Sequence, residues 1–397
     1  MTGKPSSELQ LASYGSPLHR PVIGWALSLL LAALTIFAVT QLAGILDPTK
    51  PARLGVFLLA LAVCGVITLI PVALLRWLDR REPEPWVVLL LAFLWGALIA
   101  TGISSEVNGI VDAAIGEMLG AILTGPIIEE IAKGLGLLVF LLLLRSEFDG
   151  PRDGFVYGVL IGLGFTWLET AVYIATGFEE SGSIAWGFQL SSRYALAGLN
   201  GHALYTGITG TFIGFSLLRK GWLSKIGLVA AGFLLAIFNH LLWNSLGTIL
   251  SGPFAGIIGT VFVGQEAVDL LSAGDLSVMP LWVSWPANVA ALLIANALGY
   301  LIILAGLVRS GRWERAVMIE QLRDEVGTSS VSAAEYANIQ GRCEPPKTPQ
   351  VARHIFTTQC NLAKRKFYLQ HHQQSFDADP VVTARRSQLQ QLRSASA

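Results

Sequence analysis

Acidic and basic side chains interrupt one of the most apolar stretches of the chain. Glu129 and Glu130 are adjacent, and Lys133 follows them at i+4 and i+3, just before an unbroken apolar run from Gly134 to Leu144. A charge at the centre of a bilayer costs about 2.5–3.5 kcal/mol on insertion scales. Three charges in one such stretch therefore need partners or a chemical purpose, and Lys133 is placed to neutralise one of the two carboxylates.

Three further ionisable groups, Glu169, His202 and His240, each interrupt a different later apolar stretch. Asn244 follows His240 at i+4 and Phe165 precedes Glu169 at the same spacing, so each pair shares one face of a helix. Carboxylates and imidazoles in a low-dielectric cavity suit the activation of water. A glutamate serves as general base, a histidine orients water, stabilises an oxyanion or binds metal, and an asparagine amide donates to an oxyanion.

The composition indicates what must position these groups. Of 397 residues, 53% are hydrophobic and 14% charged, whereas soluble domains average about 25% charged. An all-α, polytopic membrane bundle is expected, because isolated strands leave backbone groups unsatisfied in lipid. The formal net charge of zero gives no bias toward nucleic acid. The three cysteines imply no disulfide framework, which together with the absence of organelle signals fits a bacterial inner membrane.

Apolar runs predict about eight spans, with two apolar or mixed segments left outside them. The spans are residues 22–46, 54–75, 86–103, 118–144, 155–176, 194–218, 226–250 and 285–307. Residues 104–116 are expected to form an amphipathic surface helix, and residues 253–264 are too short to cross and read as re-entrant or interfacial. Glycines at i, i+4 spacing, such as Gly154, Gly158 and Gly162, predict close helix packing.

Lysine and arginine are concentrated in alternate loops and after residue 309, which places both termini in the cytoplasm. The expected organisation is an N-terminal cytoplasmic tail (1–21), a transmembrane bundle (22–309) with a catalytic core at about 118–250, and a cytoplasmic tail (310–397). The tail is polar and basic, lacks a sustained apolar period and is expected to be largely disordered.

The polar groups within the predicted spans share one depth. Counted from the outer ends of their spans, Glu129, Glu169, His202 and His240 lie within roughly 6 Å of one another at 1.5 Å per residue. Unrelated structural accidents are not expected to share a level. A single polar cavity that opens toward the outer face explains the coincidence.

Four motifs in order resemble the PrsW family of intramembrane proteases. They are the pair at 129–130 with Lys133, the stretch from Asp153 to Glu169, the segment Gly201–Gly207, and Asn239-His240-Leu-Leu-Trp-Asn244. The resemblance covers about residues 120–250, and the family is a distant relative of the CAAX prenyl protease type II and bacteriocin-processing enzymes. It implies a polytopic membrane peptidase and, as in the founding bacterial members, cleavage of a membrane-anchored anti-sigma factor near its extracytoplasmic side.

Carried over by position, Glu129 and Glu130 match the family's glutamate pair, Glu169 its third glutamate, and His202 and His240 its two histidines. Two mechanisms stay open. In the first, Glu129 activates water while His240 and Asn244 stabilise the oxyanion. In the second, Glu169, His202 and His240 hold a zinc ion whose bound water attacks, with Glu129 or Glu130 as general base. Zinc is the only cofactor that either mechanism invokes.

Two other classes of protein would also place carboxylates and histidines at mid-membrane. A channel, a transporter or a proton relay is one alternative, although no repeat relates the first four spans to the last four. A membrane scaffold whose basic tail binds a partner is another. The expected partners of a peptidase are a membrane-anchored protein substrate and the bilayer, and the sequence does not predict an oligomeric state.

Overall fold

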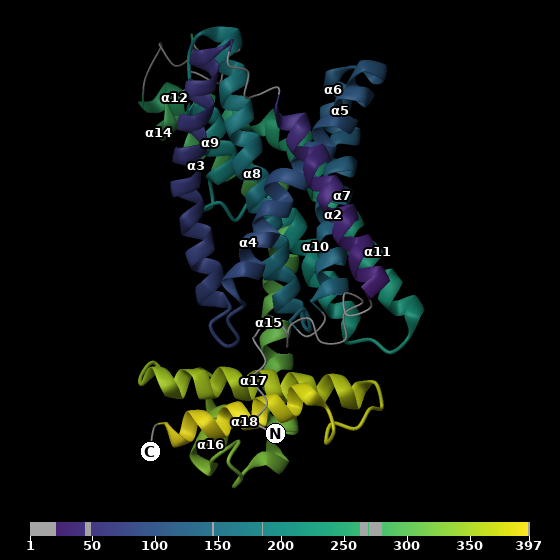
Figure 1. Ribbon diagram of the computed structural model, residues 1–397. Coiled ribbons are helices and arrows are strands. Elements are labelled where there is room, and N and C mark those ends of the chain that lie inside the picture. The colour runs from purple at the N-terminus through teal and green to yellow at the C-terminus, as the bar shows by residue number, and fades with distance from the viewer. Residues whose placement is uncertain are drawn as a thin grey trace.

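In the computed structural model, residues 21–43, 49–144, 147–184, 186–262, 269 and 280–395 are described, and the N-terminal tail predicted for 1–21 lies almost wholly outside them. This described part is helical, with an isolated bridge between Val326 and Val331 as its one β feature. The chain forms a tall helical bundle with a smaller helical unit across one end (Figure 1).

The helices of the bundle are, in chain order, α2 (Pro21–Leu42), α3 (Pro51–Leu78), α4 (Trp86–Leu94), α5 (Thr101–Ile115), α6 (Glu117–Leu119), α7 (Gly125–Leu143), α8 (Pro151–Ser181), α9 (Trp186–Tyr194), α10 (His202–Leu217), α11 (Trp222–Leu242), α12 (Thr248–Phe262), α14 (Leu281–Ala295) and α15 (Ala297–Gln321). Three π-helical segments join some of them without a break: η3 (Trp95–Ala100), η4 (Gly120–Thr124) and η5 (Trp243–Gly247).

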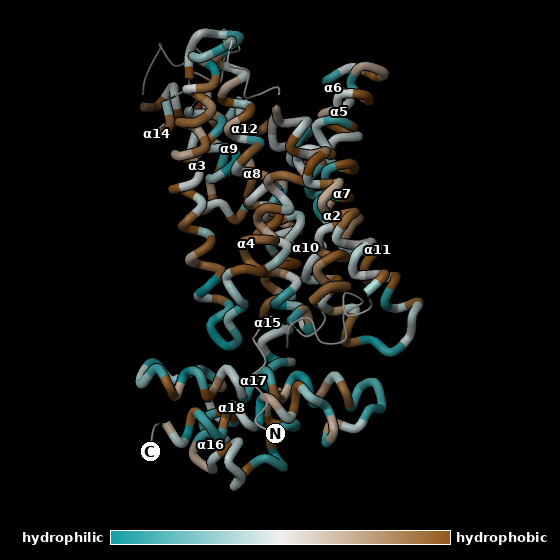
Figure 2. The backbone as a smooth tube through the Cα atoms, in the orientation of Figure 1, coloured by the Kyte–Doolittle hydropathy of each residue, from teal (hydrophilic) through white to brown (hydrophobic). Residues whose placement is uncertain are grey.

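The bundle has the length and the surface of a membrane protein. Four helical runs among the described residues are long and apolar enough to span a bilayer: Pro51–Leu78, Trp86–Ile115, Pro151–Ser181 and Trp222–Gly247. The bent pair of α14 and α15 makes a fifth if it counts as one span. Large apolar side chains such as Val66 and Leu69 face outward, and apolar residues predominate along the bundle (Figure 2). An α-helical membrane bundle is therefore confirmed, and the count of eight stays a prediction.

Helix α8 is the central element of the bundle. It contacts α3, α4, η3 and α10, and 83% of its most apolar 18-residue window is buried within the protein. Close approach to α10 depends on glycine. A Cβ on Gly154 would lie 2.1 Å from the backbone oxygen of Gly210, and one on Gly162 would lie 2.3 Å from that of His202. The predicted glycine ladder is thus confirmed as a packing device.

Two segments were predicted to lie apart from the spans, and one of them is continuous with a span. Residues 104–116 form most of α5, which continues α4 through η3 in one run from Trp86 to Ile115. Residues 253–262 belong to α12, which follows α11 through η5. The separate surface helix is therefore wrong, because the π-helical segment η3 continues the helix where a break was assumed. The re-entrant or interfacial piece stays a prediction, since Ile249–Phe262 is a shorter apolar helix beyond the spanning run that ends at Gly247.

Two predicted spans differ from the structure in where the helix runs. The span 194–218 begins only at His202, since the preceding turn contains Gly198 and Gly201 at φ values of 73° and 55°. The span 285–307 is broken at Asn296, where α14 and α15 meet at an angle of 72°. Positive φ favours glycine, so the first boundary is encoded locally.

The C-terminal region is ordered in its described part, which corrects the prediction that 310–397 is largely disordered. It forms α16 (Ala333–Gly341), α17 (Gln350–His371) and α18 (Pro380–Ser394). Buried apolar residues from these helices and from the end of α15 pack into one cluster, which includes Met318, Leu322, Ile339, Phe356, Leu362 and Leu389. Polar residues between these positions hide the pattern in the sequence. Two local signals do exist: Ser332 caps α16 reciprocally with Glu335, and Asp379 caps α18.

Lys364 of α17 attaches this C-terminal unit to the bundle. Its ammonium group pairs with Glu82 in the loop before α4, and lies 2.9 Å from Asp149 Oδ1 and 3.4 Å from Asp153 Oδ1 at the start of α8. Burial lowers the pKa of Lys364, but the neighbouring Asp149, Asp153 and Glu82 outweigh it and hold that pKa well above its ordinary value. The lysine therefore remains charged within this acidic pocket.

A second buried contact at the same end has the opposite arrangement of charge. Glu314 of α15 is 3% exposed and forms two ion pairs. Its Oε2 lies 3.2 Å from Arg81 Nη1, and its Oε1 lies 3.1 Å from Arg152 Nε. Arg152 is the neighbour of Asp153 at the start of α8. Both contacts thus converge on the same end of the bundle's central helix.

Candidate active site

The glutamate pair and its lysine lie on α7 in the interior of the bundle. Lys133 and Glu130 are fully buried and Glu129 is 8% exposed. The Lys133 ammonium lies 2.6 Å from Glu130 Oε1 and 3.6 Å from Glu129 Oε2. The predicted pairing at i+3 and i+4 is confirmed, and Glu130 is the carboxylate that Lys133 neutralises more closely.

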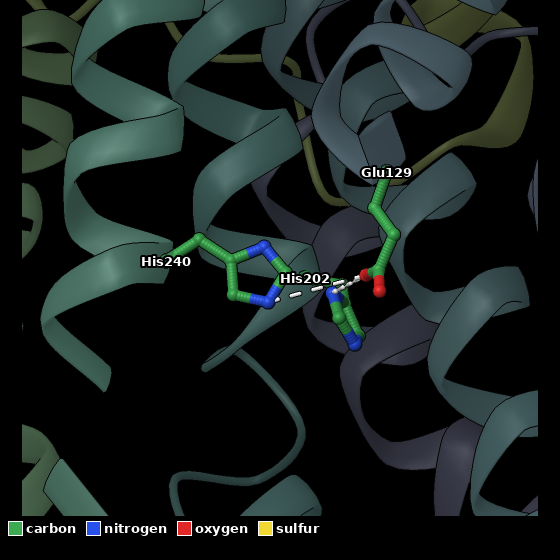
Figure 3. A group of neighbouring side chains, drawn as sticks. All are labelled: Glu129, His202 and His240. Carbon is green, nitrogen blue, oxygen red and sulfur yellow. Dashed lines mark ion pairs between the residues drawn. The ribbon is translucent and has the colours of Figure 1, made fainter. Parts of the chain in front are cut away.

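Two histidines from separate helices face Glu129. His202 opens α10 and His240 stands near the end of α11, with ring centres 5.0 Å apart. Glu129 Oε2 lies 3.7 Å from His202 Nδ1 and 3.9 Å from His240 Nε2, as the dashed lines in Figure 3 show. Helices α7, α10 and α11 therefore bring one carboxylate oxygen and two imidazole nitrogens to a common centre.

The remote ring nitrogens contact carboxylates that carry their own cations. His240 Nδ1 lies 3.1 Å from Glu130 Oε1, the oxygen that Lys133 also contacts. His202 Nε2 lies 2.8 Å from Glu169 Oε2, which pairs with Arg193. A carboxylate in an ion pair accepts hydrogen bonds, so both of these remote nitrogens carry the proton. These partners assign lone pairs to His202 Nδ1 and His240 Nε2, the nitrogens that face Glu129.

This donor set suits a divalent transition metal. Glu129, His202 and His240 each offer a ligand atom within 4.8 Å of the others. Glu129 Oε2 is buried and, within the described part of the chain, makes no hydrogen bond. Two imidazoles and a carboxylate are the ligand count of a catalytic zinc site. The Lys133 ammonium lies 2.8 Å from His202 Nδ1 and has to leave that nitrogen before the imidazole ligates an ion.

The structure brings most of the predicted residues together, with two differences in their arrangement. Glu169 contacts the far side of His202, so Glu129 takes its place beside the two histidines in the group of possible ligands. Asn244 lies on η5 and donates to the backbone oxygen of Ala121 in η4 at 2.8 Å. Its amide thus ties two π-helical segments, a contact that the sequence spacing did not indicate.

Phe165 has the supporting position that was expected. Its ring lies 4.7 Å from that of His202, and the Lys133 ammonium lies 4.3 Å from its centre. An aromatic face next to a buried ammonium group is favourable. Phe165 therefore limits where both the imidazole and the lysine can lie.

Several residues at the site were not predicted from the sequence. Tyr205 stacks on His240 with ring centres 4.8 Å apart and donates to Asn296 at the break between α14 and α15. Asn108 of α5 approaches Glu129 Oε1 at 3.4 Å, and Arg193 pairs with Glu169. Tyr205 follows His202 at i+3, a detectable signal. Arg193 lies in a predicted loop and Asn108 outside a predicted span, where an ionisable or amide side chain attracts no notice.

Fold and site together define a polytopic membrane protein with a buried centre suited to activating water. The profile described as PrsW family intramembrane metalloprotease matches residues 84–265, which contain every proposed ligand. Protease PrsW of Geobacillus kaustophilus is 30% identical over 170 residues, 41% of this chain and 68% of that relative. For Protease PrsW of Oceanobacillus iheyensis the identity is 26% over 210 residues, 50% of this chain and 90% of the relative. The chain therefore belongs to the PrsW family of intramembrane proteases.

No solved structure matches this chain. The comparisons concern the PrsW family, so the distant relationship to the CAAX prenyl proteases stays a prediction. Membership of this family confirms the predicted peptidase class.

Proposed function

We propose that this protein is an intramembrane endopeptidase whose reacting centre is formed by Glu129, His202 and His240. One observation carries the proposal: the lone-pair nitrogens of two imidazoles converge on a buried carboxylate oxygen that has no hydrogen-bond partner within the described residues. Structural ion pairs do not need this convergence. A site that holds a metal ion or an attacking water does.

The same three residues are the proposed ligands of a zinc ion, which when bound polarises a carbonyl oxygen and acidifies a coordinated water. Glu130 and Glu169 orient the two imidazoles from behind. Lys133 balances the charge of the glutamate pair, and Thr206 donates to Glu130 Oε2 at 3.3 Å. In the metal-free alternative, Glu129 is the general base and the two imidazoles orient the water.

The proposed substrate is a membrane-anchored protein that is cut in the outer half of the bilayer. His202 begins α10, Glu129 lies in the first turns of α7, and His240 lies in the last turn of α11. These helix ends are the ones directed away from the C-terminal unit (Figure 1). Because basic loops and the basic C-terminal unit mark the cytoplasmic side, the centre lies toward the opposite face. A membrane-anchored anti-sigma factor is the substrate class implied by the family resemblance.

The test compares N-terminal peptides in cells that express the wild type or Glu129→Gln. New N-termini within or next to the transmembrane segments of single-pass proteins are expected with the wild type only. Glu106→Gln, an exposed change on α5, is the matched control and should resemble the wild type. Identical N-termini in all three strains, with equal amounts of folded protease, would refute the peptidase proposal.

The metal proposal has its own measurement. Elemental analysis of the purified wild type should give about one zinc per chain, and His202→Ala/His240→Ala should give none. Freshly purified, folded wild type without stoichiometric metal would refute the zinc site and favour the mechanism in which Glu129 activates water.

A further inference from the structure

Arg193 is a cation at the centre's edge to which neither the sequence motifs nor the chemistry above assigns a role. It lies in the last turn of α9 and is 20% exposed at its side chain. Its guanidinium pairs with Glu169 and lies 4.7 Å from the centre of the Tyr173 ring, and its Nε donates to Gln189 Oε1 at 3.3 Å. Three partners on two helices thus fix the orientation of this side chain.

Helix α9 is itself held in place by hydrogen bonds to α14. Asn288 donates to Ser191 Oγ at 2.9 Å, Ser284 donates to the backbone oxygen of Gly187 at 3.1 Å, and Trp285 donates to that of Ala195 at 3.1 Å. Ser191, Ser284 and Asn288 are buried. The short helix that carries Arg193 is therefore a braced element, although it occupies what the sequence presents as a polar connection.

Glu169 has Arg193 as its ion-pair partner. Lys133, the buried cation on α7, lies 2.6 Å from Glu130, the carboxylate behind His240. Arg193 is thus the cation in direct contact with Glu169 within the described residues. Because Glu169 Oε2 is also the partner of His202 Nε2 at 2.8 Å, one oxygen links the guanidinium to the imidazole.

We propose that Arg193 is a positioning residue that holds Glu169 against His202 Nε2 and so keeps the unprotonated Nδ1 of His202 on the side of Glu129 and Lys133. The remote nitrogen of each histidine then faces its own cation–carboxylate pair, Arg193 with Glu169 behind His202 and Lys133 with Glu130 behind His240. Lys133 also contacts the near nitrogen of His202, Nδ1, at 2.8 Å. Arg193 does not touch the reacting centre and acts through Glu169. The consequence for metal binding rests on the proposed function, whereas the consequence for the imidazole does not.

The first test reads the His202 ring directly in metal-free protein. The chain has six histidines, so ¹⁵N-histidine labelling in lipid nanodiscs gives few signals, and His202→Gln identifies the one that belongs to His202. We expect a protonated Nε2 and an unprotonated Nδ1 in the wild type, and a loss of this single state in Arg193→Gln. Arg193→Lys should restore it in part, because lysine keeps the charge but lacks the planar fork. An Arg193→Gln spectrum identical to that of the wild type would overturn the proposal.

The second test measures zinc affinity by competition with a chelator. Loss of a group that orients a ligand typically lowers metal affinity about 10–100-fold, and we expect this for Arg193→Gln. Glu169→Gln and the double variant Glu169→Gln/Arg193→Gln should show the same loss, since the two residues act in series. Additive losses would overturn the link through Glu169.

Arg53→Gln is the matched control. Arg53 also pairs with a glutamate of α8, Glu179, at 3.1 Å and has a similar side-chain exposure of 17%, but it lies away from the centre. It should leave the His202 signals and the zinc affinity unchanged. If the wild type binds no zinc and cuts no protein while the His202 state still depends on Arg193, then the proposed function fails and the positioning role stands.

Discussion

Adding one methyl group at Gly162 should disturb the site by forcing apart the helices α8 and α10. An ideal Cβ at this position would lie 2.3 Å from the backbone oxygen of His202 and 2.6 Å from the nitrogen of Ala203. Both atoms are backbone, so no side chain can move aside. Ordinary contact begins at 3.4 Å, and α8 and α10 must therefore separate by about 1 Å.

That separation acts on the contact which orients His202. Glu169 lies on α8 and His202 on α10, and their 2.8 Å hydrogen bond lengthens toward a distance at which it no longer fixes the ring. Overpacking costs about 1–3 kcal/mol of stability. A displacement of this size at a catalytic centre costs on the order of 100-fold in rate. Gly162→Ala should therefore lose about 100-fold in rate, equivalent to about 2.7 kcal/mol in the barrier, beside a loss of about 1–3 kcal/mol in stability.

Gly177→Ala on the same helix is the control, because a Cβ there meets nothing within 4 Å. It should be neutral or gain about 0.5–1 kcal/mol from the better helix propensity of alanine. The assay combines thermal unfolding in detergent with initial rates on a substrate found by N-terminal proteomics. If Gly162→Ala matches Gly177→Ala in both measurements, the reasoning from close helix approach is wrong.

Three further expectations concern other parts of the chain. Lys364→Met leaves buried carboxylates without their cation, which costs about 3–5 kcal/mol, and limited proteolysis should then cut the C-terminal unit faster than in Lys364→Arg. Asn296→Ala deprives the Tyr205 hydroxyl of its acceptor, so the thermal midpoint should fall by the equivalent of about 1–3 kcal/mol, whereas a midpoint equal to that of the wild type would contradict the network. Burial raises the pKa of Glu335, but Arg393 and the Ser332 N–H outweigh it and lower that pKa, so the stabilisation is present above the ordinary carboxyl pKa and is lost as the pH falls through the lowered value. Circular dichroism of Glu335→Gln should accordingly show a weaker dependence on acid than the wild type.

The helical membrane bundle and the reacting centre could be predicted because both follow from the local amino-acid composition. Long apolar runs specify spans, and a charged residue within such a run is rare enough to identify the site. Glu129, His202 and His240 were found in this way, at the shared depth that their positions along the spans indicated. The glycine ladder was found through its spacing of four residues.

The remaining contacts of the site could not be predicted, because they depend on which way each helix is rotated and on how far long side chains reach. Whether Glu129 or Glu169 joins the two histidines depends on side-chain direction, which the depth of a residue does not specify. Arg193 was missed because its partner is 24 residues away and on another helix. The C-terminal unit was missed because its core forms between helices, where no single segment shows a continuous apolar face.

Buried ion pairs at the start of α8 join the bundle to its C-terminal unit. The bundle contributes a pocket of carboxylates that Lys364 occupies, and a pair of arginines that Glu314 joins. Cutting the chain after the last transmembrane residue would therefore not release a smaller working enzyme. It would leave two buried charge clusters of opposite sign facing water at the foot of the helix that carries Glu169. The contacts that stabilise the bundle therefore extend past the membrane-spanning helices into the C-terminal unit.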